Sequence, residues 1–321
     1  MDCKILTIIV TFNGMKWIDK CILSVISSSI KSDIFVVDNA SSDGTPDYIA
    51  KNFPTVLLTR SPKNLGFGAA NNIGLQYAID KGYDYVYLLN QDAWIKEDTF
   101  EKLISIQKQH PEYGILSPMQ LDADERKMNK FFGDIVCSRL NEQSFAEDLF
   151  FKKVMPVYSV RRIMAAHWLI SKKCLFTVGG FSPSFYHYGE DDNYSDRVWH
   201  KGFKIGFCPQ IQVVHDTEHR IPERTRKSYL RYCRAISDIC GFEKTVKQSV
   251  YDYAYDIFLA FWNNEYSKKT LIKYFFKLLI NISSHIQNKT ISQKECAFLN
   301  ICSNINKKNN PKPQIYVSQT I

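Results

Sequence analysis

ILTIIVTFNG, residues 5–14, begins with a continuous run of apolar and β-branched residues and ends in a polar turn. Such a run is typical of a strand buried on both faces of a sheet. The pattern returns in IFVVDNASSDGT (34–45) and VYLLNQDAW (86–94), and a shorter strand signal lies at 56–59. Helical patterns separate these runs at 17–26, 45–52 and 67–81. This alternation predicts an α/β fold with a parallel sheet and helices on both faces.

Polar residues stand where these predicted strands end. In open α/β sheets, ligands bind beyond the carboxyl ends of the strands, so these residues are the first candidates for a ligand site. They are Thr11, Asn13, Asp38, Asn39, Asn90 and Asp92.

The segment NLGFGAANN, residues 64–72, contains two glycines where the third helix is expected to begin. Gly66 and Gly68 would let the backbone approach a ligand closely, and a helix N-terminus offers amide groups to phosphate. The segment is not a dinucleotide fingerprint, because Asn71 replaces the third glycine and the segment follows the third strand rather than the first. The alternative is that the glycines only form a turn.

NQDAW, residues 90–94, directly follows an apolar strand signal. An aspartate at a strand end, here Asp92, can hold Mg²⁺ or Mn²⁺, which use few protein carboxylates and bridge to substrate phosphates. The alternative is that Asp92 caps the helix expected to begin near Lys96. A second candidate ligand is His215, which ends the strand signal IQVVH. Imidazole suits Mn²⁺, although a histidine in this position can also be purely structural.

GEDDNYSDR, residues 189–197, places the carboxylates of Glu190, Asp191 and Asp192 side by side. Crowded carboxylates are difficult to ionise together, so at least one pKa is expected to rise toward the value that suits a general base. The alternative is an acidic helix start that complements the helix dipole, with Arg197 as its partner.

Charge is distributed unevenly along the 321 residues. Residues 1–221 hold 25 Lys/Arg and 26 Asp/Glu (net −1), and residues 222–321 hold 16 and 7 (net +9), which together give the net charge of +8. The signals after Pro222 are almost wholly helical, so we place a domain boundary near residue 221. The nine cysteines are odd in number and have no C-x-x-C spacing, which argues against a disulfide framework and favours a reducing, cytoplasmic compartment. No signal peptide or membrane-spanning run is expected.

Six stretches of the chain together resemble the family 2 glycosyltransferases, particularly their bacterial rhamnosyltransferase-like branch. They are ILTIIVTFNG, IFVVDNASSDGT, NLGFGAANNIGL, VYLLNQDAW, VGGFSPSFYHYGEDDNYSDR and IQVVHD. The resemblance covers residues 4–216. It implies the GT-A fold, a Rossmann-like mixed sheet flanked by helices, here with a mostly helical extension at 222–321. The nucleotide-sugar half would be 1–120 and the acceptor half 121–221. The resemblance also implies a nucleotide-diphospho-sugar donor, Mg²⁺ or Mn²⁺, and inversion at the anomeric carbon.

Carried over position by position, the resemblance also assigns roles. Asp191 would be the catalytic base, Asp92 and His215 would hold the metal, and Glu190 and Trp168 would lie on the acceptor side. The donor-binding residues would be Thr11, Asn13, Asp38, Asn64, Gly66, Asn72 and Asn90. Two positions depart from the family pattern, because Asn90 replaces the first aspartate of D-x-D and Asn193 replaces the last aspartate of Glu-Asp-x-Asp.

The sequence also allows three other interpretations. A sugar nucleotidyltransferase would carry a glycine-rich basic phosphate loop near the first strand, where this chain has TFNGMKW. An inactive glycan-binding protein would not need Asp92, Asp191 and His215. Nucleic-acid binding, suggested by the basic C-terminal third, lacks a supporting motif. The acceptor expected from the resemblance is a surface polysaccharide or a lipid-linked oligosaccharide.

The last expectation concerns residues 269–282 of the basic region. Lys269, Lys273, Lys277 and Asn281 recur every four residues and form one polar stripe amid apolar residues. Such a helix can lie at the inner surface of the cell membrane as a peripheral contact. It can equally pack against the catalytic domain or another subunit.

Overall fold

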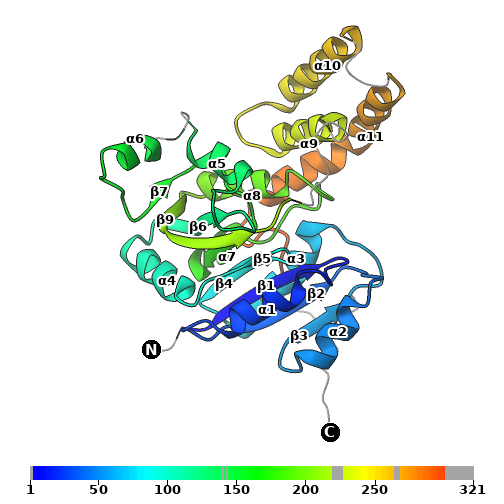
Figure 1. Ribbon diagram of the computed structural model, residues 1–321. Helices are drawn as coiled ribbons and strands as arrows, with labels where there is room; N and C mark the ends of the chain where they lie inside the picture. Colours follow the sequence, from blue (N-terminus) through cyan, green and yellow to red (C-terminus); the bar gives the residue numbers. More distant parts are fainter. Residues whose placement is uncertain (1–2, 139–140, 142–143, 219–226, 264–267, 301–321) are drawn as a thin grey trace.

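One mixed sheet dominates the computed structural model, which describes residues 3–138, 141, 144–218, 227–263 and 268–300 (Figure 1). The strands are β1 (Ile5–Thr11), β2 (Asp33–Asp38), β3 (Leu57–Arg60), β4 (Tyr85–Asn90), β5 (Ala93–Trp94), β6 (Tyr113–Leu121), β7 (Tyr158–Ser159), β8 (His167–Ser171) and β9 (Lys204–His215). The helices are α1 (Ile18–Ile26), α2 (Thr45–Asn52), α3 (Phe67–Lys81), α4 (Thr99–Gln109), α5 (Lys130–Val136), α6 (Phe145–Phe150), α7 (Lys172–Val178), α8 (Glu190–His200), α9 (Lys227–Cys240), α10 (Val246–Trp262) and α11 (Lys268–Ser292).

The sheet has the strand order β3-β2-β1-β4-β8-β6-β9-β5, and β7 pairs with β9. Strands β1 to β4 are parallel, whereas β8 runs antiparallel to both β4 and β6. The predicted α/β class, with a mixed sheet, flanking helices and a helical C-terminal region, is confirmed.

Both faces of the sheet are covered by apolar side chains. Successive residues of β1 point to opposite faces, so Leu6 and Ile8 join the buried cluster that contains α3, whereas Ile5 and Ile9 join the cluster that contains α1. Burying each such side chain contributes about 1.5–3 kcal/mol. The continuous apolar run in β1 is therefore explained by burial on both sides.

Strand β6 was missing from the sequence prediction. Ser117 and Pro118 interrupt its apolar pattern, and proline is unexpected inside a sheet because it cannot donate a ladder hydrogen bond. The pairing of β6 with β9 shifts register between Pro118 and Met119, and this irregularity accommodates the proline. The strand then continues to Gln120, which becomes important for the site below.

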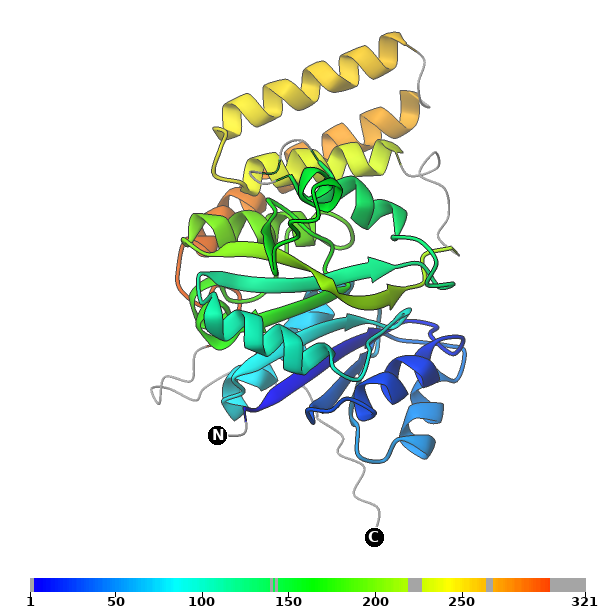
Figure 2. The ribbon, with the colours of Figure 1, turned by 60° about the vertical axis from the view of Figure 1, so that its left-hand side comes forward.

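The C-terminal helices α9, α10 and α11 pack together at one end of the molecule, away from β1–β3 (Figures 1 and 2). Beyond α11 the chain returns to the sheet domain, where the amide of Gly180 donates to the carbonyl of Ala297 (2.8 Å) and the amide of Cys296 to that of Phe176 (3.0 Å). The boundary near residue 221 falls within 219–226, outside the described residues. Across the part of the chain that is described, no helix is long and apolar enough to cross a bilayer.

Candidate active site

Three strands end together at one edge of the sheet. In the parallel ladder, Thr11 of β1 lies opposite Asp38 of β2, and Val10 of β1 lies opposite Asn90 of β4. The polar residues that follow these strands therefore meet at the carboxyl edge, where ligands of α/β sheets bind.

The carboxylate of Asp38 is held in a fixed orientation. Its Oδ1 accepts a hydrogen bond from the hydroxyl of Thr11 (2.9 Å), and its Oδ2 accepts one from the amide of Ser41 (3.0 Å). Both Thr11 and Asp38 are buried. Thr11 therefore contributes to this edge through Asp38, whose orientation it fixes.

The neighbouring turn is built on Asn13, which has a positive φ of 52°. Asparagine tolerates this left-handed conformation better than most residues. Its side-chain oxygen accepts from the amide of Ser42 (2.9 Å), and its own amide donates to the hydroxyl of Ser41 (2.9 Å). These bonds join the loop after β1 to the loop after β2.

Asn39 organises the glycine-containing loop before α3. Its Nδ2 donates to Oδ1 of Asn64 (3.0 Å) and to the carbonyl of Gly66 (3.3 Å), and its Oδ1 accepts from the amide of Leu65 (2.7 Å). Asn64 also accepts from the amide of Gly66 (2.9 Å). The strand-end position of Asn39 marked it for inspection, but its partners could only be seen in the folded chain.

The two loop glycines approach other parts of the protein closely. A Cβ at Gly66 would lie closer than 3.0 Å to the backbone oxygen of Tyr186, and one at Gly68 would lie 2.9 Å from the Cβ of Phe181. Asn72 adds a second link, because its amide group both accepts from and donates to the backbone of Phe181 (2.7 and 2.9 Å). These contacts fasten the glycine-containing loop at 64–72 to the segment that precedes α8, a role that the motif did not predict.

The two predicted metal ligands come together at the same edge. Oδ1 of Asp92 lies 3.5 Å from Nε2 of His215, and both side chains are buried. The Nδ1 atom of His215 lies 3.1 Å from Oε1 of Gln120. Because an amide oxygen only accepts, Nδ1 is the donor in this bond, and Nε2 is the ring nitrogen that faces Asp92.

This donor set fits a divalent cation. Histidine ligands of metals generally donate their second ring N–H to a neighbouring acceptor, which is what Gln120 provides for His215. Among the described residues, no group of three or more His, Cys, Asp or Glu side chains could hold a metal. The protein would therefore supply Asp92 and His215, leaving further positions for phosphate oxygens and water, as Mg²⁺ sites commonly do.

A second histidine supports this edge from within the sheet. His167 is fully buried, lies 3.0 Å from the carbonyl of Val214 through Nε2, and lies 2.8 Å from the hydroxyl of Tyr87 through Nδ1. Burial, followed by the neighbouring His215, lowers the pKa of His167 to about 3. It is therefore a neutral structural residue that ties β9 to β8 and β4.

Gln91, the central residue of the N-x-D segment, holds the loop after β1. Its Oε1 accepts from the amide of Phe12 (2.8 Å), and its Nε2 donates to the carbonyl of the same residue (3.1 Å). A Cβ at Gly14 would collide with the amide group of Gln91. Sequence reasoning missed Gln91, although its position between Asn90 and Asp92 could have drawn attention to it.

The carboxylate of Asp216 joins the first helix to this edge. Nε1 of Trp17 donates to it (2.7 Å), and Nζ of Lys16 lies 3.7 Å away. The amide of Asp216 donates to the carbonyl of Asp92 (2.8 Å). The segment just before α1 is thereby held next to the two predicted metal ligands.

The three neighbouring carboxylates open helix α8. Glu190 is buried, and burial, followed by repulsion from Asp191, raises its pKa to about 8. Burial and then Asp192 raise the pKa of Asp191 to about 7. The pKa of Asp192 is also raised by burial, although Arg162 and Arg234 oppose the increase. Asp191 thus has a pKa near the range in which a general base works at neutral pH.

The arginine that balances this cluster is not the one considered from the sequence. Nη1 of Arg162 lies 3.9 Å from Asp192. Arg197 is instead fully buried and donates to the carbonyls of Gly180 (2.5 Å) and Val178. It stabilises the turn before α8 and does not pair with the acidic residues.

Trp168 does not lie on an acceptor surface. It is fully buried in β8 and stacks against Phe181 at a ring-centroid distance of 6.3 Å, with Tyr194 at 5.6 Å. The acceptor-side role expected for Trp168 is therefore corrected to a core role. The side chains of alternate residues in a strand point to opposite faces, and the sequence did not reveal that both faces are covered here.

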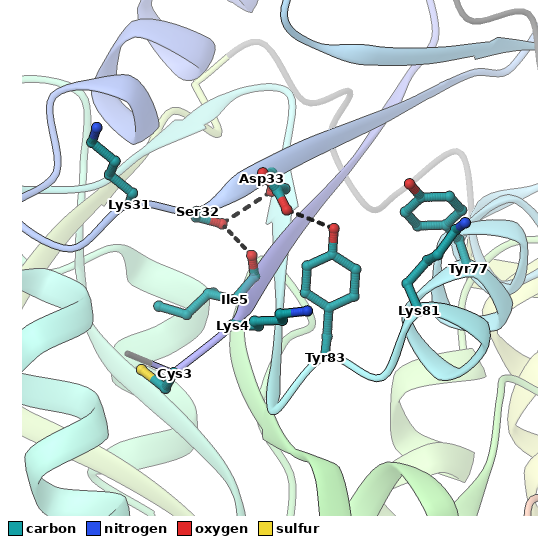
Figure 3. A pocket seen from close by; sticks show the side chains of 9 residues that line it. All are labelled: Cys3, Lys4, Ile5, Lys31, Ser32, Asp33, Tyr77, Lys81 and Tyr83. Atoms are coloured by element: carbon teal, nitrogen blue, oxygen red, sulfur yellow. Dashed lines mark hydrogen bonds between the residues drawn. The ribbon is translucent and has the colours of Figure 1, made fainter. Parts of the chain in front are cut away.

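A hollow of about 400 Å³ lies at the opposite edge of the sheet (Figure 3). It surrounds the amino ends of β1 and β2, and Figure 3 shows the hydroxyl of Tyr83 donating to Asp33 (2.7 Å) beside several lysines. None of the residues at the carboxyl edge lines this hollow. It is therefore separate from the candidate site.

Comparison with known proteins shows what the chain is similar to. Residues 7–146 match the model of glycosyl transferase family 2. This segment of the chain is similar to that family. The chain is 26% identical over 214 residues to an N-acetylglucosaminyl-diphospho-decaprenol L-rhamnosyltransferase of Mycobacterium tuberculosis, covering 58% of this chain and 67% of the relative. It is 22% identical over 218 residues to the dTDP-rhamnosyl transferase RfbF of Shigella flexneri, covering 67% and 70%.

Solved structures agree on the fold of this chain. The mannosyltransferase PcManGT of Pyrobaculum calidifontis, in complex with GDP-Man and Mn²⁺, superimposes with a TM-score of 0.55 at 15% identity, covering 91% of this chain and 87% of that one. The GT-A arrangement expected from the sequence is confirmed.

Proposed function

We propose that this protein is a glycosyltransferase that moves a hexose, with rhamnose as the first candidate, from a nucleotide-diphospho-sugar to a hydroxyl of a surface polysaccharide or a lipid-linked oligosaccharide. The observation that carries the proposal is the placement of Asp92 and His215, 3.5 Å apart, at the strand edge that also holds Asp38. The sugar and the acceptor are suggested by the names of the two rhamnosyltransferase relatives.

Asp92 and His215 would hold Mg²⁺ or Mn²⁺ against the donor diphosphate. When bound, the cation neutralises negative charge on the leaving nucleoside diphosphate. Asp38 and Asn13 would contact the nucleoside, and the Asn64–Gly66 loop and Asn90 would face the donor. Gln120 would keep His215 in the tautomer that a ligand requires.

Asp191 would accept the proton of the acceptor hydroxyl as its oxygen forms a bond to the anomeric carbon. The bond from that carbon to the diphosphate oxygen breaks at the same time, and the nucleoside diphosphate leaves with the electron pair. This single displacement inverts the anomeric configuration and needs no covalent enzyme intermediate. A base in hydrogen-bond reach typically accelerates such a step by about 10²–10⁴-fold. Glu190, directly beside the base, would line the acceptor side.

A donor panel tests the proposal. The full chain is incubated with several nucleotide sugars and a saccharide acceptor, with Mn²⁺ or with EDTA, and nucleotide release and product are measured. We expect one preferred donor, loss of transfer in EDTA, and an NMR product spectrum with the anomeric configuration opposite to that of the donor. Retention of configuration, or full activity in excess EDTA, would contradict the mechanism.

A further inference from the structure

Helix α10 exposes a continuous aromatic stripe. Tyr251, Tyr255, Phe258 and Trp262 follow one another at spacings of four, three and four residues, which places them on one helix face, and all four are exposed. Trp262 is 76% exposed and Phe258 58%. The opposite face, with Ser249, Tyr253 and Ala260, is the buried one. Large aromatic side chains in this arrangement are uncommon on a surface that meets only water.

Acidic charge is absent from this stripe. Asp252 forms an ion pair with Lys244 (2.9 Å) and Asp256 forms one with Arg231 (3.0 Å), so both carboxylates of α10 are directed to partners within the helical region. Lys247 precedes Tyr251 by one turn and is exposed. The outer face of α10 therefore combines aromatic rings with positive charge.

Helix α11 repeats this combination. Ile272, Phe276 and Ile280 recur every four residues and are exposed, with Ile280 at 79%. Lys269 and Lys273 are exposed as well, and the helix contains no aspartate or glutamate. Its buried side, including Leu271 and Leu278, packs toward α9.

We propose that the outer faces of α10 and α11 form a docking surface for an anionic lipid bilayer. Exposed tryptophan, tyrosine and phenylalanine suit the boundary between headgroups and acyl chains, and lysines attract anionic headgroups. If this face instead bound a second copy of the chain, the lysines of the two copies would face each other, and these two helices offer no matching acidic patch. This surface is wider than the 269–282 segment expected from the sequence and has its main aromatic anchors on α10.

The docking helices also contact the segment before α8. The hydroxyl of Tyr229 on α9 donates to the carbonyl of His187 (3.0 Å), and Asn288 on α11 donates to the hydroxyl of Ser184 (2.9 Å). Docking would therefore bring Asp191 and the segment before it to the membrane that carries the lipid-linked acceptor. Only this step rests on the proposed function.

Vesicle flotation of the full chain tests the surface. We expect binding to vesicles of phosphatidylcholine with phosphatidylglycerol at low salt, and weaker binding at high salt or without phosphatidylglycerol. Lys269→Glu combined with Lys273→Glu should weaken vesicle binding at least about 20-fold, because each lysine near an anionic surface strengthens binding by roughly 5-fold. Phe258→Ser combined with Trp262→Ser should weaken it at least about 10-fold through lost apolar burial.

A matched control and a direct probe sharpen the result. Phe150→Ser combined with Phe151→Ser removes two aromatic side chains that are 80% and 63% exposed outside the proposed surface, and it should leave flotation unchanged. Brominated lipids should quench the fluorescence of Trp262, and Trp262→Phe should abolish most of this quenching while keeping the protein bound.

Two outcomes would overturn the docking surface. One is failure of the intact chain to float with anionic vesicles. The other is a concentration-dependent dimer that Trp262→Ser dissociates, which would assign the face to a second copy. Transfer to a soluble acceptor is measured on the same samples. If the intact chain floats with the vesicles but transfers no sugar, the result would count against the proposed function alone.

Discussion

Replacing Gly66 by alanine tests how the donor-side loop is joined to the segment before α8. Gly66 has a φ of +84° and a ψ of 169°, a backbone region in which other residues are strained by about 1–3 kcal/mol. Its new Cβ would also overlap the backbone oxygen of Tyr186, and relieving such an overlap costs about 1–3 kcal/mol more. We therefore expect Gly66→Ala to destabilise the protein by about 3 kcal/mol or more.

Gly82 provides the matched control. It has a φ of +71° at the end of α3, and a Cβ there would meet nothing within 4 Å. Gly82→Ala should cost only the left-handed backbone strain, about 1 kcal/mol.

Differential scanning fluorimetry measures both variants. At roughly 2 °C per kcal/mol for a chain of this size, we expect the melting temperature to fall by about 2 °C for Gly82→Ala and about 6 °C or more for Gly66→Ala. Gly66→Ala should also raise the KM for the donor, whereas Gly82→Ala should leave it unchanged. Equal melting temperatures for the two variants would refute the close approach to Tyr186.

Three further predictions concern the site. Asp191→Asn should abolish transfer but keep donor binding, as measured by calorimetry. The kcat/KM of the wild-type protein should rise with pH through about 7, following the raised pKa of Asp191. Normal transfer by Asp191→Asn together with an inactive Glu190→Gln would move the base to Glu190. Gln91→Ala should raise the donor KM and leave the acceptor KM unchanged, because the substitution removes both hydrogen bonds to the backbone of Phe12. An unchanged donor KM would show that Gln91 has no positioning role. Asp92→Ala should lower activity at least about 100-fold, a loss of roughly 2.7 kcal/mol, and Mn²⁺ titration should show weakened metal dependence; full activity in EDTA would contradict it.

The pKa of Glu190 also makes a prediction about stability. Its pKa in the folded protein, about 8, exceeds the ordinary value of 4.5. The folded state therefore holds the proton more tightly than the unfolded state, and this stabilisation is lost as pH rises from about 4.5 to about 8. Glu190→Gln should accordingly raise the melting temperature more at pH 8 than at pH 5. An equal change at both pH values would show that the carboxyl is not buried as described.

Residues on regular elements were the easiest to predict from the sequence. The helix at 45–52 and the helix at 67–81 have the bounds that were expected, because helical spacing and glycine positions are local signals. Strand ends marked Asp92 and His215 as separate candidates, and the family resemblance paired them; the structure places them 3.5 Å apart although they are far apart in sequence.

Features that depend on tertiary contacts were not predictable in this way. The partners of Asn39, Gln91 and Gln120 are side chains and backbone groups on other elements, and a single sequence does not state which loops will meet. Trp168 was misjudged for the same reason, because its position in a strand does not reveal which elements cover each face.

The contacts between the donor-side loop and α8 suggest why the motif residues alone are insufficient for the site. Glu190, next to the proposed base, packs against Gly68 of the donor side, and Asn72 holds the backbone of Phe181. The same turn is fixed from the other side by Arg197 and by the returning segment at Ala297. The position of Asp191 at the start of α8 is thus set by three parts of the chain, one of which lies beyond α11. A chain truncated after α11 would keep every motif residue, yet it would lose the hydrogen bond from Gly180 to Ala297 that helps to place the proposed base.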